Sequence, residues 1–368
     1  MSKIKVLQIS HGLAPGGIES FLLNIYENIE KDNIEISFAV AANGKQYHED
    51  RILKNGDKVY HTSDLNGANN ILKHFFRLIK LLKKEGPFDV VHSHIDFFNG
   101  VNILAAFIAG VPVRISHSHN TNSANANTTK IKMPILLYRN FMRTLINKFS
   151  TVTLGCSTEA NDYMYGNNHN AKVICNGINF NEFMESKRCP ININLDKTKI
   201  NFITIGRLCE QKNSIFIVKI LNELIKIRKD IHLYWVGKGP QENEVKNIIK
   251  GLKLERHITL LGARNDISEI LSISDFMIFP SKWEGLPVTL VEAQVAQVPC
   301  FISDVISNEA NLGLCTKISL KSDAKIWAIK INDYIENNTF NNKIDKKKLN
   351  NFNIKNVTKQ MKNIYLCK

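Results

Sequence analysis

The sequence predicts an α/β protein built from two doubly wound domains, because of its length and because one pattern runs through it twice. The chain has 368 residues, which at about 150 residues per domain allows two domains with separate cores. Short apolar runs rich in β-branched residues alternate with longer segments of helical period, as in parallel sheets covered by crossover helices. The alternation starts afresh near residue 200, so we expect one domain on each side of that point.

The first domain begins with a strand, a tight turn at Gly16 and Gly17, and a helix. Apolar residues recur on one face over 18–29, which predicts that helix. Two later segments, 71–84 and 133–149, mix apolar and basic residues at helical spacing. The strands expected in this domain are 4–9, 36–41, 90–92, 113–116 and 152–155.

The second domain repeats the order of strand and helix. Its first strand ends at Gly206, and the polar stretch 186–199, which has no strong period, marks the break before it. Two such domains leave a cleft at the carboxyl ends of their strands, where ligands bind in open α/β sheets. The expected strands are 200–205, 232–236, 258–261 and 276–279, with helices at 215–228 and 351–365.

Composition excludes several classes of protein. The 48 Lys and Arg against 34 Asp and Glu leave a formal net charge of +14, which favours an anionic partner such as nucleic acid, lipid headgroups or a phosphorylated small molecule. No run of about 18 apolar residues and no signal-peptide pattern occurs, so we expect a soluble, unexported protein. The seven cysteines form no C-x-x-C pair, which argues against a disulfide framework or a zinc ribbon.

The segment 279–293 carries the strongest functional signal. A strand ends, a short loop presents Glu284, and a helix begins near Pro287, which a first turn tolerates because the missing N–H would have no partner there. The free amides and the positive dipole end of such a helix suit an anion. Glu292 lies inside the helix, so the two carboxylates suit two parts of one elongated polar ligand better than a tight acid–base pair. Taken singly, each glutamate also fits an ordinary solvated position.

A second signal follows the first strand of the second domain. Gly206 allows a close approach of the backbone, and Arg207 and Lys212 lie five residues apart in a strand-to-helix loop, where two cations can converge on a diphosphate. The corresponding loop of the first domain, 11–17, does not fit G-x-G-x-x-G, which argues against an NAD-dependent enzyme.

Four histidines follow two strands of the first domain. His92 and His94 follow one strand, and His117 and His119 follow another. A four-histidine metal site is one interpretation. No acidic residue lies within 97–158 to support such ligands, so we favour loops that line the cleft, with at least one histidine in a functional polar role.

At this point the chain resembles a known family. Glu284 and Glu292 with the residues between them match the E-x7-E signature of retaining glycosyltransferases with the GT-B fold, specifically family 4, and the likeness is greatest to its capsule and exopolysaccharide branch. Asn179 stands where aspartate is common and Pro287 replaces a frequent glycine. Further matches, in the family's order and spacing over 4 to about 304, are Gly16 to Glu19, Ser157 with Glu159, 175–178, Gly206 to Lys212, 236–240, and 261–262 with Arg264 and Asp266.

The resemblance implies a nucleotide-diphosphate sugar, which we expect to be a UDP-sugar, bound by a C-terminal domain over 189–345. It implies an acceptor-side domain over 1–188 and a final helix within 346–368 that packs back toward it. For the histidine that contacts the transferred sugar, the resemblance points to His119, with His117 as the alternative. Glu19 is a further acceptor-side candidate. The implied roles are the diphosphate for Arg207 and Lys212 beside Gly206, the transferred sugar for Glu284 and His119, the ribose for Glu292, the sugar or phosphate for the amides of Gly285 and Leu286, the base for the segment around Arg264, and closure on the phosphates for Gly16 and Gly17.

Retention in this family is explained by attack on the face from which the leaving group departs, with the donor phosphate taking the acceptor proton. That account needs no protein nucleophile, in agreement with the absence of a close carboxylate pair. D-x-D, the usual signature of a metal-bridged diphosphate, does not occur in the sequence. We therefore predict metal-independent transfer with no cofactor, the nucleotide sugar being a co-substrate.

The positive charge suggests a second use at a membrane. The range 97–158 holds six cations and no acidic residue, and the segments 71–84 and 133–149 resemble basic amphipathic helices that lie on anionic membranes. An ordinary crossover helix explains 71–84 equally well. With the family resemblance, we expect a cytoplasmic enzyme, peripheral on the inner face of the membrane, that extends a glycan or a polyprenyl-diphosphate-linked acceptor beside the polar loop 121–129.

Other classes remain as alternatives. A nucleotide-sugar epimerase of the same fold would need no acceptor, and a pyridoxal-type phosphorylase would need a cofactor lysine and a longer chain. A nucleic-acid-binding protein would explain the charge, but the sequence has no recognisable helix-turn-helix, zinc finger or RNP strand, so we predict no nucleic-acid partner.

Overall fold

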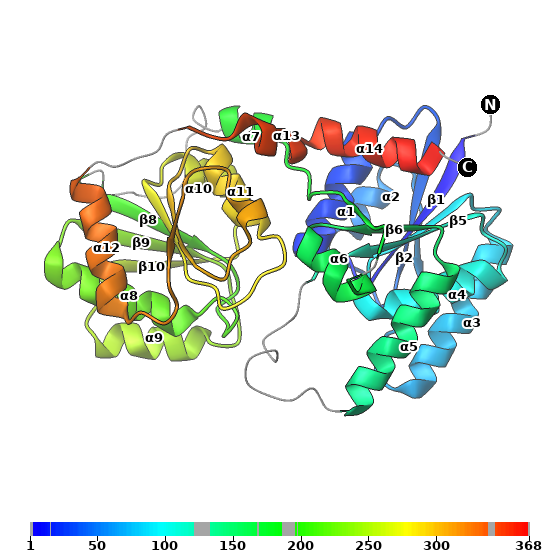
Figure 1. Cartoon of the computed structure of the whole chain (residues 1–368), viewed down its shortest axis with the longest axis horizontal. Helices are drawn as coiled ribbons and strands as arrows, with labels where there is room; N and C mark the ends of the chain where they lie inside the picture. The colour runs from blue at the N-terminus through cyan, green and yellow to red at the C-terminus, as the bar shows by residue number, and fades with distance from the viewer. Residues whose placement is uncertain are drawn as a thin grey trace. The chain divides into compact units, whose positions relative to one another are not determined.

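The computed structural model describes residues 3–14, 16–120, 133–167, 169–185, 196, 198–337 and 343–366. The chain forms two compact units, each with its own parallel sheet (Figure 1). Unit 1 comprises Met1–Ile178 and Asn351–Lys368, and unit 2 comprises Asn179–Asn350. The predicted class, two doubly wound α/β domains, is confirmed.

Unit 1 contains a seven-stranded sheet in the order β3-β2-β1-β4-β5-β6-β7, and every neighbouring pair is parallel. The five predicted strands are present, with shifts of at most two residues at their ends. The edge strands β3 and β7 were not predicted, because segments of three and two residues carry no measurable period. The strands are β1 Ile4–Ser10, β2 Ile34–Val40, β3 Val59–His61, β4 Val90–Ser93, β5 Val113–Ser118, β6 Val152–Gly155 and β7 Lys172–Val173.

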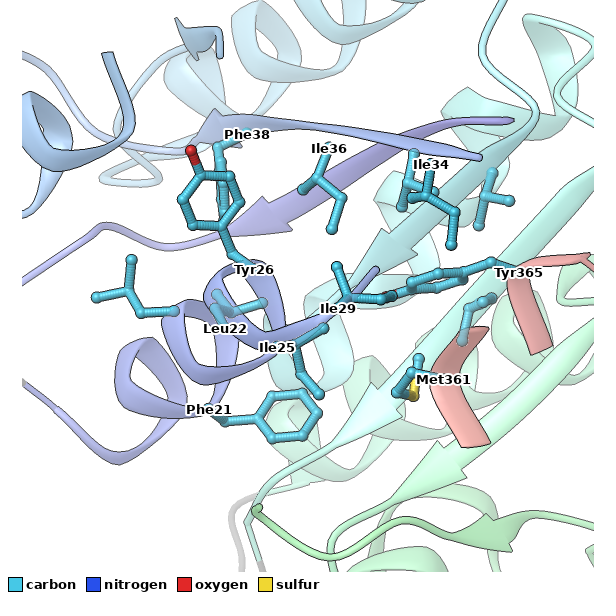
Figure 2. Close-up of a cluster of buried hydrophobic side chains, with 14 of the residues drawn as sticks. Phe21, Leu22, Ile25, Tyr26, Ile29, Ile34, Ile36, Phe38, Met361 and Tyr365 are labelled. Atoms are coloured by element: carbon cyan, nitrogen blue, oxygen red, sulfur yellow. The ribbon is translucent and has the colours of Figure 1, made fainter. Parts of the chain in front are cut away.

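Helices cover both faces of this sheet because successive side chains of a strand point to opposite faces. In β1, Val6 packs into the core with α1 and α14, whereas Leu7 and Ile9 pack into a second core with α3 and α4. Figure 2 shows the first core, with side chains from α1, β2 and α14 facing one another. The elements of unit 1 outside the sheet are α1 Gly17–Asn28, α2 Glu49–Leu53, α3 Ala68–Lys84, the 3-10 turn Asp96–Phe98, α4 Asn99–Ile108, α5 Met133–Phe149, α6 Thr158–Tyr165 and α14 Ile354–Leu366.

Unit 2 contains a six-stranded parallel sheet in the order β10-β9-β8-β11-β12-β13. The sequence did not single out β12 and β13. Its largest core joins the sheet to α8, α9 and α12, with Trp235 and Trp327 fully buried. The strands are β8 Ile200–Ile205, β9 Ile231–Val236, β10 Ile258–Gly262, β11 Phe276–Phe279, β12 Cys300–Ser303 and β13 Cys315–Ile318. The helices are α7 Phe180–Glu185, α8 Ser214–Ile227, α9 Glu242–Gly251, α10 Ile267–Ser272, α11 Val288–Val295, α12 Ala324–Glu336 and α13 Lys346–Asn351, with a 3-10 turn at Asn308–Ala310.

The division between the units differs from the expected boundary after 188. It lies after Ile178, because α7 packs against α10 and α11 and therefore belongs to unit 2. The chain returns to unit 1 at Asn351, and there Ile178 N–H donates to the carbonyl of Phe352 at 2.7 Å. Within α14, Met361 and Tyr365 are buried against α1 (Figure 2).

None of the helices in the described part of the chain combines the length and the apolar character that crossing a membrane requires.

Candidate active site

In unit 2, the loops that follow β8, β9 and β10 are joined by backbone hydrogen bonds at the carboxyl edge of the sheet. Gly206 N–H donates to Val236 O at 2.9 Å, and Gly237 N–H donates to Gly262 O at 2.8 Å. Gly206 and Gly237 both have positive φ, and a Cβ on Gly237 would collide with the carbonyl of Gly206. The glycines noted in the sequence therefore let these loops lie against one another.

The structure brings Lys212 and Glu284 together, although 72 residues separate them in the chain. Lys212 Nζ lies 2.6 Å from Glu284 Oε1, and the two side chains are only 18% and 8% exposed. The same ammonium group lies 4.6 Å from the centre of the Phe279 ring. A Cβ on Gly206 would lie 2.9 Å from Lys212 Cε, so the glycine makes room for the lysine. Charged groups this well buried are stable only when paired, so the pair shapes the loop edge.

The two predicted arginines of unit 2 differ in their surroundings. Arg207 is exposed and, among the described residues, has no hydrogen bond or ion pair. Arg264 donates from Nε to Asp266 Oδ1 at 2.8 Å and forms a second bond to the other carboxylate oxygen. Arg207 is therefore an available cation, whereas Arg264 is held by its neighbour.

The helix predicted after Pro287 is present as α11, with Pro287 at its N-cap. Gly285 and Leu286 precede it, and Leu286 is buried. Glu292 lies inside α11, and burial raises the pKa of its carboxyl to about 7, an effect to which the charge of Glu182 adds. A substantial fraction of this carboxyl is therefore protonated near neutral pH and can donate a hydrogen bond.

In unit 1, Gly16 and Gly17 form the start of α1, with Gly16 as its N-cap. A Cβ on Gly16 would collide with Glu19 Oε2, so the carboxyl of Glu19 lies against this turn. Burial raises the pKa of Glu19. The turn thus places backbone amides and one acidic side chain at the same end of the helix.

The four histidines noted in the sequence form one buried cluster at the carboxyl ends of β4 and β5. His94 Nδ1 lies 2.8 Å from His119 Nε2, and His92 Nε2 lies 3.1 Å from His117 Nδ1. Phe21 of α1 packs against the rings of His94, His117 and His119. Burial lowers the pKa of all four, that of His119 to about 3, so they are neutral at physiological pH.

Two members of this cluster were missed by sequence reasoning. Gln8 Nε2 donates to Tyr365 Oη at 2.7 Å, and Tyr365 Oη lies 2.9 Å from His92 Nδ1. Gln8 is a polar residue inside an otherwise apolar strand, which is a usable signal. Tyr365 lies 357 residues further along the chain, and no local pattern indicates that α14 contacts β1 and β4.

The geometry of the histidine cluster can be compared with the metal site that the sequence offered as one interpretation of these histidines. Ring nitrogens of His92, His94 and His117 lie within 4.8 Å of one another, the one such group found among the described residues. The bonds among the histidines, Gln8 and Tyr365 already use most of those nitrogens, so a metal would have to break them. The acceptor loop predicted at 121–129 lies outside the described residues.

Comparison of the sequence with known families and proteins identifies glycosyltransferases as its relatives. A family described as "Glycosyltransferase Family 4" matches residues 15–182, and one described as "Glycosyl transferases group 1" matches residues 187–350. The chain is 30% identical to the putative glycosyltransferase EpsF of Bacillus subtilis, over 89% of this chain and 86% of the relative. It is 30% identical to the capsular polysaccharide biosynthesis glycosyltransferase CapH of Staphylococcus aureus, over 99% of each chain.

A further relative and a solved structure extend the comparison. The chain is 27% identical to an Escherichia coli UDP-Gal:alpha-D-GlcNAc-diphosphoundecaprenol alpha-1,3-galactosyltransferase, over 83% of this chain and 81% of the relative. HepE of Anabaena, solved with UDP and glucose, matches 98% of each chain with a TM-score of 0.78 at 17% identity, a likeness that shows the fold.

The two parallel sheets and this likeness define the fold class, GT-B, with two Rossmann-like domains. The chain belongs to the family 4 glycosyltransferases, in the branch of capsule and exopolysaccharide synthesis. It is a hexosyltransferase-type glycosyltransferase of polysaccharide synthesis.

Proposed function

We propose that the protein is a retaining, metal-independent glycosyltransferase that moves a sugar from a UDP-sugar to a lipid-diphosphate-linked glycan. The observation that carries the proposal is the pair of Lys212 and Glu284 at the carboxyl edge of the sheet in unit 2, where the exposed Arg207 follows Gly206 in the loop after β8. Ligands bind at this edge in open α/β sheets. The name of the E. coli relative and the ligands of HepE support UDP, and the same relative supports a diphosphoundecaprenol-linked acceptor.

The charges of this edge suit a leaving diphosphate. When the bond between sugar and phosphate breaks, negative charge grows on the phosphate oxygens, and fixed cations lower the energy of that state. Arg207 is available for this role, and Lys212 gives a second cation whose position Glu284 holds. Glu284 would accept hydrogen bonds from hydroxyl groups of the transferred sugar.

The same proposal includes the remaining contacts of unit 2 with the nucleotide sugar. Glu292 would bind the ribose hydroxyls, and the backbone amides of Gly285 and Leu286 the sugar or phosphate. Arg264, which Asp266 orients, would flank the base. The pKa of about 7 allows Glu292 to act either as donor or as acceptor toward a ribose hydroxyl.

Transfer without a metal and with retention is the mechanistic part of the proposal. The sequence lacks D-x-D, and in the described part of unit 2 the carboxylates Glu284 and Asp266 are already bonded to Lys212 and Arg264. Cationic side chains then do what a divalent cation does elsewhere. The donor phosphate would take the acceptor proton on the face that the leaving group vacates.

The test uses the purified full chain with a panel of UDP-sugars and an undecaprenyl-diphosphate-linked monosaccharide. We expect one UDP-sugar to give a disaccharide product whose new linkage keeps the donor's anomeric configuration, as read by NMR coupling constants. Interconversion of the UDP-sugar without acceptor would instead identify an epimerase. An inverted linkage would contradict the retaining mechanism.

We further propose that unit 1 docks on an anionic membrane through α3 and α5. Both helices pack against α4. The N-terminal half of α5 leaves apolar side chains exposed, Leu137 and Phe141 by 62% and 59%, a pattern of helices that lie in the interface. Lys80, Lys83 and Lys84 are exposed on α3.

Some of the cations predicted in this region are engaged within unit 1 and are not available to a membrane surface. Arg114 donates to the backbone carbonyls of Val111 and Phe149, and Arg143 donates to those of Tyr163 and Met164. These arginines therefore stabilise unit 1, so the docking surface depends on α3 lysines and on the apolar residues of α5.

A further inference from the structure

Gln8 lies at the centre of the buried histidine cluster, where its amide group faces two ways. Its Nε2 donates to Tyr365 Oη at 2.7 Å, and its Oε1 lies 2.8 Å from His94 Nε2. Each of the four imidazoles is neutral and carries one ring hydrogen. The position of every hydrogen then follows from the two ends of the glutamine.

The first chain of hydrogen bonds runs from Tyr365 to His117. The tyrosine hydroxyl accepts a bond from Gln8, and in the described part of the chain His92 Nδ1, at 2.9 Å, is the remaining partner for its hydrogen, so it donates to that atom. His92 therefore carries its hydrogen on Nε2 and donates to His117 Nδ1 at 3.1 Å. His117 is left with its hydrogen on Nε2.

The second chain runs from Gln8 to His119. Because Gln8 Oε1 only accepts, His94 carries its hydrogen on Nε2 and leaves Nδ1 as an acceptor. His119 Nε2 donates to that atom at 2.8 Å. His119 Nδ1 is therefore a free lone pair.

Both chains end in atoms that have no hydrogen-bond partner in the described part of the chain, His117 Nε2 and His119 Nδ1. The two rings are stacked with their centres 4.2 Å apart. One end is a donor and the other an acceptor, and a buried polar atom without a partner is costly. A hydroxyl group can satisfy both ends, whereas an ionised phosphate or carboxylate only accepts.

We propose that Gln8 and Tyr365 are positioning residues that fix the tautomers of the four histidines, so that His117 offers a donor and His119 an acceptor to one hydroxyl of a sugar ligand. The sugar as ligand rests on the proposed function, but the tautomers do not. Because α14 supplies Tyr365, the last helix of the chain (Figure 2) is part of this device and not only a cover for the core. The ring of Phe21 packs against both His117 and His119, and the two unpartnered nitrogens are buried, so a hydroxyl reaches them only when neighbouring side chains shift.

The test is ¹⁵N NMR of the full chain labelled at histidine, which distinguishes protonated from unprotonated ring nitrogens. We expect all four histidines to carry their hydrogen on Nε2. Tyr365→Phe removes the donor to His92 Nδ1, so His92 and His117 should become tautomer mixtures while His94 and His119 stay unchanged. Gln8→Met removes the group that orients both hydrogen-bond chains, so all four histidines should become tautomer mixtures.

Tyr26→Phe is the matched control. Tyr26 is a fully buried tyrosine of the same unit whose hydroxyl bonds to Asp57 at 2.6 Å, so its loss should leave all four tautomers unchanged. With the sugar donor that supports transfer, kcat/KM of Tyr365→Phe should fall about three- to tenfold, as for one weakened hydrogen bond. Tyr26→Phe should retain the wild-type value.

Three results would overturn the proposal: hydrogens on Nδ1 in the wild-type cluster, tautomers that do not respond to Tyr365→Phe, or a stoichiometric metal ion bound by these histidines in the purified protein. If the tautomers are as expected but no sugar is transferred, the proposed function fails and the positioning by Gln8 and Tyr365 stands.

Discussion

The two sheets present opposite chemistry at the same edge. At the carboxyl edge of unit 1 the four histidines are neutral, buried and joined in hydrogen-bond chains that begin at Gln8. At the carboxyl edge of unit 2 they are charged and partly exposed, as in the pair of Lys212 and Glu284. Burial without a counter-charge lowers the pKa of a histidine until it is neutral, whereas a paired lysine and glutamate keep their charges.

This difference suits the two units to different parts of the proposed reaction. Neutral donors and acceptors recognise hydroxyl groups, and fixed cations stabilise an anionic leaving group. Under the proposed function, two doubly wound domains of similar size would differ in role because of a few side chains at strand ends and not because of their folds. Substitutions in each unit, changes of pH and chelation can each break this contrast.

Removing charge from unit 2 should have the largest effect. Glu284→Ala leaves Lys212 without its partner and removes a proposed contact to the sugar, so we expect kcat to fall by on the order of 10²–10³. Glu242→Ala is the control, because it breaks the exposed pair with Lys246 in α9 of the same unit. If kcat of Glu284→Ala equalled that of the control, unit 2 would not bind the donor as proposed.

Glu292 is the exception in unit 2, because burial and not an ion pair determines the pKa of its carboxyl. Its folded pKa of about 7 exceeds the model-peptide value of 4.5, so the folded state binds the proton more tightly and stability falls as pH rises through 7. Glu292→Gln should therefore stabilise unit 2 by about 3 kcal/mol at pH 8 and by little at pH 5. Tryptophan fluorescence in urea measures this, because all three tryptophans, Trp235, Trp283 and Trp327, lie in unit 2. A gain independent of pH would contradict the raised pKa.

Unit 1 should respond to pH in the opposite direction. The folded pKa of His119, about 3, lies below the usual 6.5, so its contribution to stability is complete above pH 6.5 and is lost as pH falls toward 3. From pH 7 to pH 5 the wild type should lose about 2 kcal/mol more than His119→Asn. Hydrogen exchange of β1 and α1 amides reports this unit, and equal losses in the two proteins would argue against a neutral buried imidazole.

Membrane docking should show a smaller effect. Reversing Lys80, Lys83 and Lys84 to glutamate should weaken sedimentation with anionic vesicles at least about tenfold, and Leu137→Asp with Phe141→Asp should weaken it in neutral vesicles as well. Lys226 and Lys246, exposed lysines of unit 2, provide the control reversals. Unchanged binding in both sets would remove the docking proposal.

Chelation should have no effect. Exhaustive treatment with EDTA should leave kcat within twofold, because in the proposed site Arg207 and Lys212 would supply the charge that a metal supplies elsewhere. Loss of turnover that Mg²⁺ or Mn²⁺ restores would show a metal-dependent reaction.

Much of the fold followed from hydrophobic pattern. Long strands such as β1 and β8 and amphipathic helices such as α3 and α5 were predicted nearly to the residue, since each buries a face with a clear period. The short strand β7, of two residues, and the assignment of α7 to unit 2 were not, because pairing partners and packing determine both.

Local pattern and motifs in register were enough to predict the class of this protein, its two parallel sheets and the family to which it belongs. Which side chains meet became clear from the packing of the folded chain: Lys212 with Glu284, and Gln8 with Tyr365 across almost the whole chain. Contacts between residues so distant in sequence arise when sheets and helices pack, and no periodicity in the chain encodes them. The charge state of the four histidines was likewise decided by burial, which no residue shows alone.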